Sequence, residues 1–293
     1  TIKIHEGCDC HCTYCIVPSA RGCPASRPVD VVLADVEGAL AAGFQELVIA
    51  GTHLARYGLE RGEEDGLVRL MEQLERYSDR CRLRLSSLEP DARLEGIVER
   101  LAGNSCWCPH LHLALQHGSD KILAEMHRPY RFAEVRRTLE QVARQLPEAN
   151  VGADFMVGYP TEDESRFEEG FAQVRELPLH YLHVFSYSPR PGTPAAQLPC
   201  ESTAAEVKDR SARLRQWARG RQEEFCQSMV GTVREVLVEK RRRKSGNHLL
   251  ALTDNYLQLQ VDGPDHWTGT RKMVQVELSA TGRLAGRSID VVE

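Results

Sequence analysis

Six short segments of the chain alternate apolar and polar residues or are rich in β-branched residues, which is the pattern of β-strands. They are TIKIHE, QELVIAG, RLRLSS, HLHLALQ, NVGADFMVG and HYLHVFSYS. Between them, apolar residues recur at helical spacing over residues 29–42, 67–77, 92–101, 132–145 and 162–176. Strands that alternate with helices predict a parallel α/β sheet or an incomplete barrel, with working groups at the carboxyl ends of the strands.

The pattern changes in the last third of the chain. The segment SYSPRPGTPA ends the alternation, and a polar helical stretch over residues 203–229 follows it. From residue 232, short strands follow one another without helices, which predicts a small all-β barrel of five strands. We therefore expect two domains, an incomplete (β/α)6 barrel over residues 1–228 and a β-barrel over residues 229–293.

The composition is that of a folded globular protein, because 42% of the 293 residues are hydrophobic and 27% are charged. The longest apolar runs fall far short of the roughly 20 residues that a membrane-spanning helix needs, so no membrane span is expected. The chain opens on Thr1 and enters a strand at once. We therefore expect an N-terminal region to precede it in the whole protein.

Charge is distributed unevenly along the chain. The net charge is −5, but residues 229–293 contain 10 Lys and Arg against 8 Asp and Glu, a surplus of +2 that leaves −7 for the rest. A basic run falls on an expected turn of the β-barrel, where it predicts contact with a phosphate backbone; the alternative is a solvated hairpin tip. The run consists of Lys240, Arg241, Arg242, Arg243 and Lys244.

Four of the ten cysteines lie within eight residues after the first strand. Cys8, Cys12 and Cys15 have the spacing C-x3-C-x2-C, which suits a four-iron, four-sulfur cluster with one iron left open for a cofactor or substrate. The alternative is a structural zinc ion with Cys10 or Cys23 as the fourth ligand. Thiols clustered in this way, without a secretory signal, favour a reducing cytoplasmic location.

The cysteine motif, with an aromatic residue before its last thiol, resembles the radical S-adenosylmethionine (radical SAM) superfamily. Within it, EGCDCHCTYCIVPSARGCPASRP, GTHLARYG, HLHLALQHGSDKILAEMHRPY and GADFMVGYPTED resemble the methylthiotransferases, and the last domain resembles their TRAM domain. The pieces RLSSLEP, HLHL and HVFSYSPRPGTPAA look most like the branch that acts on threonylcarbamoyladenosine in tRNA. The branches for isopentenyladenosine and for a ribosomal-protein aspartate are the alternatives.

The resemblance implies an activity and its partners. One iron-sulfur cluster on this chain would bind S-adenosylmethionine and generate a 5'-deoxyadenosyl radical, which removes the hydrogen at carbon 2 of the adenine before sulfur is inserted. A second S-adenosylmethionine would supply the methyl group. The expected partners are the tRNA anticodon stem-loop and an electron donor such as flavodoxin or ferredoxin, with the enzyme as a monomer.

The resemblance also implies a domain that this sequence lacks. Relatives in the family have an N-terminal domain whose three cysteines hold a second iron-sulfur cluster. We therefore expect the sequence to be part of a longer protein. The alternatives are a shortened tRNA-binding relative that does not insert sulfur and an unrelated zinc-bound RNA-binding protein. Cys106 and Cys108 are read as incidental thiols rather than substitute ligands.

Residues at the predicted strand ends, together with the aromatic beside Cys15, are expected to bind the cofactor. They are Tyr14, Gly51, Thr52, Ser86, Ser87, Gln116, Asp154, Gly158 and Pro160. The alternative is ordinary turn hydrogen bonding for the polar members and core packing for Tyr14. Arg21, Arg27 and Arg128 match arginines of the family and are expected to meet an anionic substrate or the cofactor carboxylate, with a surface role as the alternative. The sequence assigns no catalytic residue.

One local departure concerns the turn after the fifth strand. The family reads Gly-Phe-Pro-Gly-Glu-Thr, whereas this chain has Thr161 in place of the second glycine. Since a side chain restricts the backbone, the turn must adopt a conformation open to threonine. A second departure is His117, which stands where serine is common.

Overall fold

The computed structural model describes all of residues 1–293 except 92, 243–247, 280–281 and 290–293. The strands of the first domain are β1 (Ile2–Glu6), β2 (Ala25–Ser26), β3 (Glu46–Gly51), β4 (Arg82–Leu85), β5 (His110–Gln116), β6 (Asn150–Val157) and β7 (Tyr181–Ser186). Its helices are α1 (Val17–Arg21), α2 (Val29–Ala41), α3 (Gly66–Leu74), α4 (Leu94–Gly103), α5 (Asp120–Glu125), α6 (Phe132–Gln145), α7 (Glu164–Arg175) and α8 (Ala204–Met229). The six expected strands and the alternation with helices are confirmed.

The expected parallel pairing is also confirmed. β1, β3 and β4 pair in parallel, as do β5, β6 and β7. The two groups are separate sheets joined by isolated bridges, Leu83 to Trp107 and Leu88 to Leu113. The first domain is thus a parallel α/β structure in which the regular strand pairing is interrupted between β4 and β5. The short β2 pairs antiparallel with β1 at the edge of the first sheet.

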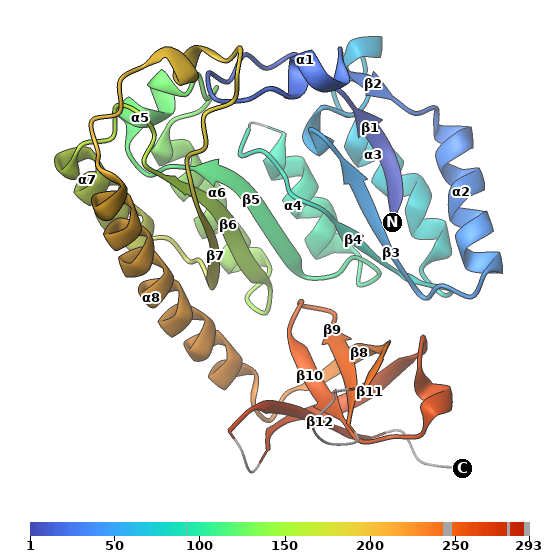
Figure 1. Ribbon diagram of the computed structural model, residues 1–293. Coiled ribbons are helices and arrows are strands. Elements are labelled where there is room, and N and C mark those ends of the chain that lie inside the picture. The colour runs from blue at the N-terminus through green and yellow to red at the C-terminus, as the bar shows by residue number, and fades with distance from the viewer. Residues whose placement is uncertain (92, 243–247, 280–281, 290–293) are drawn as a thin grey trace.

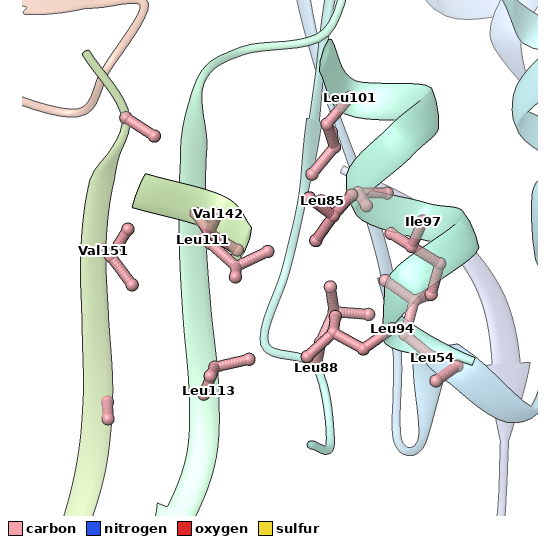
Figure 2. Packing of buried hydrophobic residues seen from close by; sticks show 14 of the residues in the cluster. Leu54, Leu85, Leu88, Leu94, Ile97, Leu101, Leu111, Leu113, Val142 and Val151 are labelled. Carbon is pink, nitrogen blue, oxygen red and sulfur yellow. The ribbon is translucent and has the colours of Figure 1, made fainter. Parts of the chain in front are cut away.

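The two faces of the sheets have different chemistry because side chains alternate along a strand. Leu111 and Leu113 of β5 and Val151 of β6 pack into the hydrophobic core with residues of α4 and α6, as Figure 2 shows. The residues that alternate with them along the strands, such as His110 and His112 of β5, lie on the opposite face, which we call the polar face. The core therefore lies between sheets and helices, and the polar face remains for binding and chemistry.

Helix boundaries follow the capping residues. α8 begins after Thr203, whose hydroxyl accepts from the Glu206 N–H while the Glu206 carboxylate accepts from the Thr203 N–H, which is a capping box. α7 begins at Glu164 rather than residue 162, because the Asp163 carboxylate caps it by accepting from the Arg166 N–H.

The last domain is a closed five-stranded barrel, as expected, with the strand order β10-β12-β11-β8-β9. Its strands are β8 (Val233–Arg242), β9 (Leu249–Thr253), β10 (Gln258–Val261), β11 (Arg271–Leu278) and β12 (Leu284–Ser288). In Figure 1 the barrel lies below the sheets, at the end opposite to α1. Within the described part of the chain, no helix combines the length and apolarity that crossing a membrane requires.

Two arginines of β4 join the barrel to the sheets. Arg82 donates to the carbonyl oxygens of Glu235 and Leu252, and Arg84 donates to those of Thr253 and Asp254. Both guanidinium groups are buried and also bind the Glu46 carboxylate. Burial raises the pKa of Glu46, but the bonds and charges of Arg84 and Arg82 outweigh it, so the net shift is downward.

Candidate iron-sulfur site

The cysteine loop follows β1 and is fixed by backbone hydrogen bonds. The Cys8 N–H donates to the Gly22 carbonyl at 3.1 Å, and the Thr13 N–H donates to the Met126 carbonyl at 3.2 Å. The Cys15 N–H closes a turn on the Cys12 carbonyl at 3.0 Å. The loop therefore holds its three motif thiols at the carboxyl ends of the strands, near α5.

Each sulfur of the motif accepts a hydrogen bond from nitrogen. The Cys10 N–H donates to Cys8 Sγ at 3.4 Å, and the Val17 N–H donates to Cys15 Sγ at 3.4 Å. Arg128 Nη1 donates to Cys12 Sγ at 3.2 Å. Donors of this kind stabilise thiolates and tune the potential of iron-sulfur clusters, so this donor set fits the expected cluster.

Arg128 is buried behind the loop instead of lying on the surface. Its side chain is 4% exposed, forms an ion pair with Glu89 and donates to the Ala114 carbonyl and to the Tyr14 hydroxyl. Burial raises the pKa of the Cys12 thiol, and the Arg128 charge opposes that rise. In this position Arg128 contacts Cys12, an expected cluster ligand, and its partner Glu89 was not among the predicted site residues.

Cys10 lies beside a histidine that sequence analysis missed. Cys10 Sγ is 3.5 Å from His53 Nδ1, and the ligand atoms of Cys8, Cys10 and His53 all lie within 4.8 Å of one another. Such a set suits a single ion, whereas a cube binds each thiolate to a different iron and keeps them farther apart. The ligand set available for the zinc alternative is therefore Cys8, Cys10 and His53. Cys23, which was expected as a possible fourth zinc ligand, is exposed and does not belong to this set. The position of His53 just after β3 was its only sequence signal.

A cavity of about 270 Å³ adjoins the loop. Tyr14, Cys15 and Ile16 line it on the loop side, and Met156 of β6 and Phe185 of β7 line it on the sheet side. Tyr14 also packs against a small buried cluster, and burial raises the pKa of its hydroxyl. Tyr14 therefore lies both in the core and at the cavity wall.

Backbone hydrogen bonds between neighbouring strands hold the predicted residues at the ends of β3 and β4. The Thr52 N–H donates to the His5 carbonyl at 3.3 Å, and the Ser86 N–H donates to the Ile49 carbonyl at 2.9 Å. A Cβ atom on Gly51 would lie 2.9 Å from the Cβ of His5, so glycine allows β1 and β3 to approach. Ser87, the fourth of these residues, is exposed.

Gln116 and Asp154 lie in different surroundings. Gln116 ends β5 with a φ of 69°, is 7% exposed, and has a buried Oε1 atom with no hydrogen-bond partner among the described residues. Asp154 was expected at a strand end, but it lies inside β6, where its carboxylate contacts His112 and His183. β6 continues to Val157, so Asp154 lies three residues before the end of the strand, and its side chain is on the polar face.

The turn after β6 explains how this chain tolerates Thr161. Gly158 has a φ of 78°, whereas Thr161 is not among the described residues with positive φ, as the sequence required. The Gly158 N–H donates to the buried Glu162 carboxylate at 3.0 Å, and the Pro160 carbonyl accepts from the Glu201 N–H at 2.8 Å. The turn is therefore held by Glu162 and by the segment before α8.

Gly158→Ala is expected to destabilise the protein more than Gly192→Ala. Both glycines have positive φ, which costs alanine about 1–2 kcal/mol. Only at Gly158 would the Cβ also meet a neighbour, Val207 Cγ2 at 2.6 Å, and overpacking adds about 1–3 kcal/mol. Denaturant unfolding measures the difference, and Gly158→Ala/Val207→Ala should be less destabilised than the sum of its single variants. Equal losses for the two glycine variants would contradict this account.

The remaining basic residues are placed as follows. Arg21 is exposed, while Arg27 donates to the Lys3 carbonyl at 2.9 Å and forms an ion pair with Asp35 at 2.5 Å. Of the basic run, Lys240, Arg241 and Arg242 belong to β8 by their backbone and not to a turn. Arg243 and Lys244 lie outside the described residues.

The fold and the cysteine loop define a class of protein. Residues 2–173 match the family model described as "Radical SAM superfamily". The chain therefore belongs to the radical SAM superfamily. Its fold is also similar to that of the radical S-adenosylmethionine methyltransferase TsrM from Kitasatospora setae, with a TM-score of 0.56 and 18% identity over 67% of this chain and 38% of that one. Methylornithine synthase is similar with a TM-score of 0.52 and 14% identity, over 74% of this chain and 61% of that one.

Two curated relatives are similar to this chain over nearly its whole length. The chain is 32% identical to tRNA-2-methylthio-N(6)-dimethylallyladenosine synthase of Coxiella burnetii (strain RSA 331 / Henzerling II), over 94% of this chain and 63% of that protein. It is 33% identical to the protein of that name from Chromobacterium violaceum, over 98% and 65%. The chain thus spans somewhat less than two thirds of the length of these relatives. Their name refers to dimethylallyladenosine and does not support the threonylcarbamoyladenosine that was expected first.

Proposed function

We propose that this chain is the radical SAM and RNA-binding part of a methylthiotransferase that adds a methylthio group to carbon 2 of N6-dimethylallyladenosine in tRNA. The observation that carries the proposal is the cysteine loop, in which Cys8, Cys12 and Cys15 each accept an N–H hydrogen bond beside a cavity. The modified base is taken from the name of the relatives.

The residues of the chain have separate tasks in this proposal. Cys8, Cys12 and Cys15 would hold a four-iron, four-sulfur cluster, which would supply the electron for radical chemistry on S-adenosylmethionine. Arg128 fixes Cys12, and Tyr14 covers one side of the cavity. Gln116 offers its buried, unpartnered Oε1 atom as an acceptor for an amino group of the cofactor or the base.

The cavity lining favours dimethylallyladenosine over threonylcarbamoyladenosine. Ile16 and Phe185, which are 38% and 37% exposed, line the cavity together with Met156. An apolar dimethylallyl chain gains from burial against such side chains, whereas the carboxylate of a threonylcarbamoyl group loses hydration there. Arg190 is the cationic member of the lining that would have to compensate for it.

The proposal also covers partners and location. The basic run 240–244 binds the phosphate backbone of the tRNA anticodon stem-loop, and flavodoxin or ferredoxin delivers electrons. The enzyme acts as a monomer in the cytoplasm. A second iron-sulfur cluster belongs to the proposal only where an N-terminal domain is present in the whole protein.

The test uses the protein expressed with any native sequence that flanks residues 1–293, reconstituted with iron and sulfide. It is incubated with anticodon stem-loops that carry dimethylallyladenosine or threonylcarbamoyladenosine, and the nucleosides are analysed by mass spectrometry. We expect the methylthio product from the dimethylallyl substrate alone. Product from the threonylcarbamoyl substrate alone would refute the proposed base. Cleavage of S-adenosylmethionine without either product would favour a tRNA-binding relative that does not insert sulfur.

A further inference from the structure

We propose that His112, Asp154 and His183 form a second metal site, separate from the cysteine loop, that binds a divalent transition-metal ion. The three residues come from neighbouring strands, β5, β6 and β7, and point to the polar face of the sheet. Asp154 and His183 are direct partners in the parallel register, and His112 is paired with Gly152, two residues before Asp154. The register therefore brings three ligands together that lie far apart in the sequence. This inference does not depend on the proposed function.

The distances suit one ion. His112 Nε2 is 3.1 Å from Asp154 Oδ1, and His183 Nδ1 is 3.6 Å from the same oxygen. All three ligand atoms lie within 4.8 Å of one another. Ligands about 2.0–2.1 Å from a tetrahedral zinc ion lie roughly 3.3 Å apart, so small side-chain rotations would complete the site.

A tyrosine orients His112 for this role. The Tyr181 hydroxyl lies 3.0 Å from His112 Nδ1 and 2.8 Å from His110 Nε2. Because a hydroxyl both donates and accepts, it can accept from His112 Nδ1–H and donate to His110, which leaves the lone pair of His112 Nε2 free for a metal. Metal ligands of the histidine type commonly have such a partner on the second ring nitrogen.

The ligand chemistry selects the class of ion. Two imidazoles and one carboxylate favour Zn²⁺ or Fe²⁺ over Mg²⁺ or Ca²⁺, which prefer oxygen ligands. The His183 side chain is 63% exposed and that of Asp154 is 26% exposed, so solvent reaches the site and coordination positions stay open.

The site has a defined position relative to the cavity beside the cysteine loop. Met156 and Phe185, which line that cavity, follow Asp154 and His183 by two residues on the same strands and the same face. Two residues along a strand correspond to roughly 7 Å. The proposed metal site therefore lies on the polar face next to the cavity.

The experiment measures Co²⁺ binding by absorption spectroscopy in cluster-free Cys8→Ala/Cys10→Ala protein, so that the set with His53 is broken and any binding by the remaining loop thiols shows as a thiolate charge-transfer band. We expect one tightly bound Co²⁺ per chain with a d–d spectrum and no thiolate charge-transfer band. His183→Ala should weaken binding at least tenfold. Tyr181→Phe should weaken it by roughly 10–100-fold, because the ligands remain but lose their orientation.

His248→Ala is the matched control, since His248 pairs with Asp262 at 2.5 Å but belongs to no group of three ligands among the described residues. Its Co²⁺ binding should equal that of the parent protein. The proposal is wrong if His183→Ala binds Co²⁺ as tightly as the control, or if the parent protein retains no Co²⁺ without a thiolate band. Thermal melts of the three variants show that each is folded.

Discussion

Cys12→Ala is expected to lose the iron-sulfur cluster completely, whereas Cys10→Ala keeps it. Iron should fall from about four per chain to near none. The open iron already lacks a protein ligand, and removal of Cys12 would leave a second iron of the cluster without one. Cys12 is 8% exposed and its sulfur accepts a hydrogen bond from Arg128. Anaerobic reconstitution followed by iron and zinc analysis measures the effect. Electron paramagnetic resonance with and without S-adenosylmethionine shows whether the cluster binds the cofactor.

Cys10→Ala distinguishes the cluster from zinc. It removes one of the three ligands that Cys8, Cys10 and His53 offer to a single ion and leaves the C-x3-C-x2-C set intact. Unchanged iron in Cys10→Ala would support the cluster. One zinc per chain in the parent protein, lost in Cys10→Ala and kept in Cys12→Ala, would instead establish the zinc site and remove the basis of the proposed function.

Arg210→Met is expected to destabilise the protein by about 3–5 kcal/mol, because it leaves a buried carboxylate without its countercharge. The Glu162 side chain is 0% exposed, and Arg210 Nη1 donates to its Oε1 at 2.9 Å. His117 Nε2 lies 3.0 Å from the other carboxylate oxygen. Unfolding by urea, followed by circular dichroism, measures the loss.

Two further variants test whether the unpaired charge of Glu162 causes the loss of stability in Arg210→Met. Arg213 lies on the same helix and pairs with Glu164 and Glu168, but its side chain is 35% exposed, so Arg213→Met should cost at most about 1 kcal/mol. Arg210→Met/Glu162→Gln should recover much of the stability, since it removes the unpaired charge. A double variant that is as unstable as Arg210→Met would mean that packing of the arginine, and not the charge of Glu162, accounts for the loss.

The regular part of the fold could be predicted because each long element carries its own period. All six parallel strands and the long helices fall where the patterns place them. The elements α1, α5 and β2 were missed because segments of two to six residues are too short to show a period. Arg82 and Arg84 of the RLRL segment alternate like solvent-facing residues, yet they are buried because the barrel covers them.

The candidate sites were predictable to different degrees. The cysteine loop is local, so spacing alone reveals it. Two sets of residues combine distant parts of the sequence. The residues of one set lie after β1 and β3, namely Cys8, Cys10 and His53, and those of the other lie within β5, β6 and β7, namely His112, Asp154 and His183. Their assembly depends on strand register, which a single sequence does not contain. The alternation HLHL nevertheless places His110 and His112 on one face, and this was the available signal for the second set.

The docking of the barrel on β4 has a consequence for how such chains evolve. Arg82 and Arg84 bind four carbonyl oxygens of the barrel, and these oxygens exist only where its strands and turns run as they do here. A barrel acquired by recombination from another gene would have to present the same oxygens, or two buried guanidinium groups would lose their acceptors. We therefore expect the sheets and the barrel to be inherited as one unit.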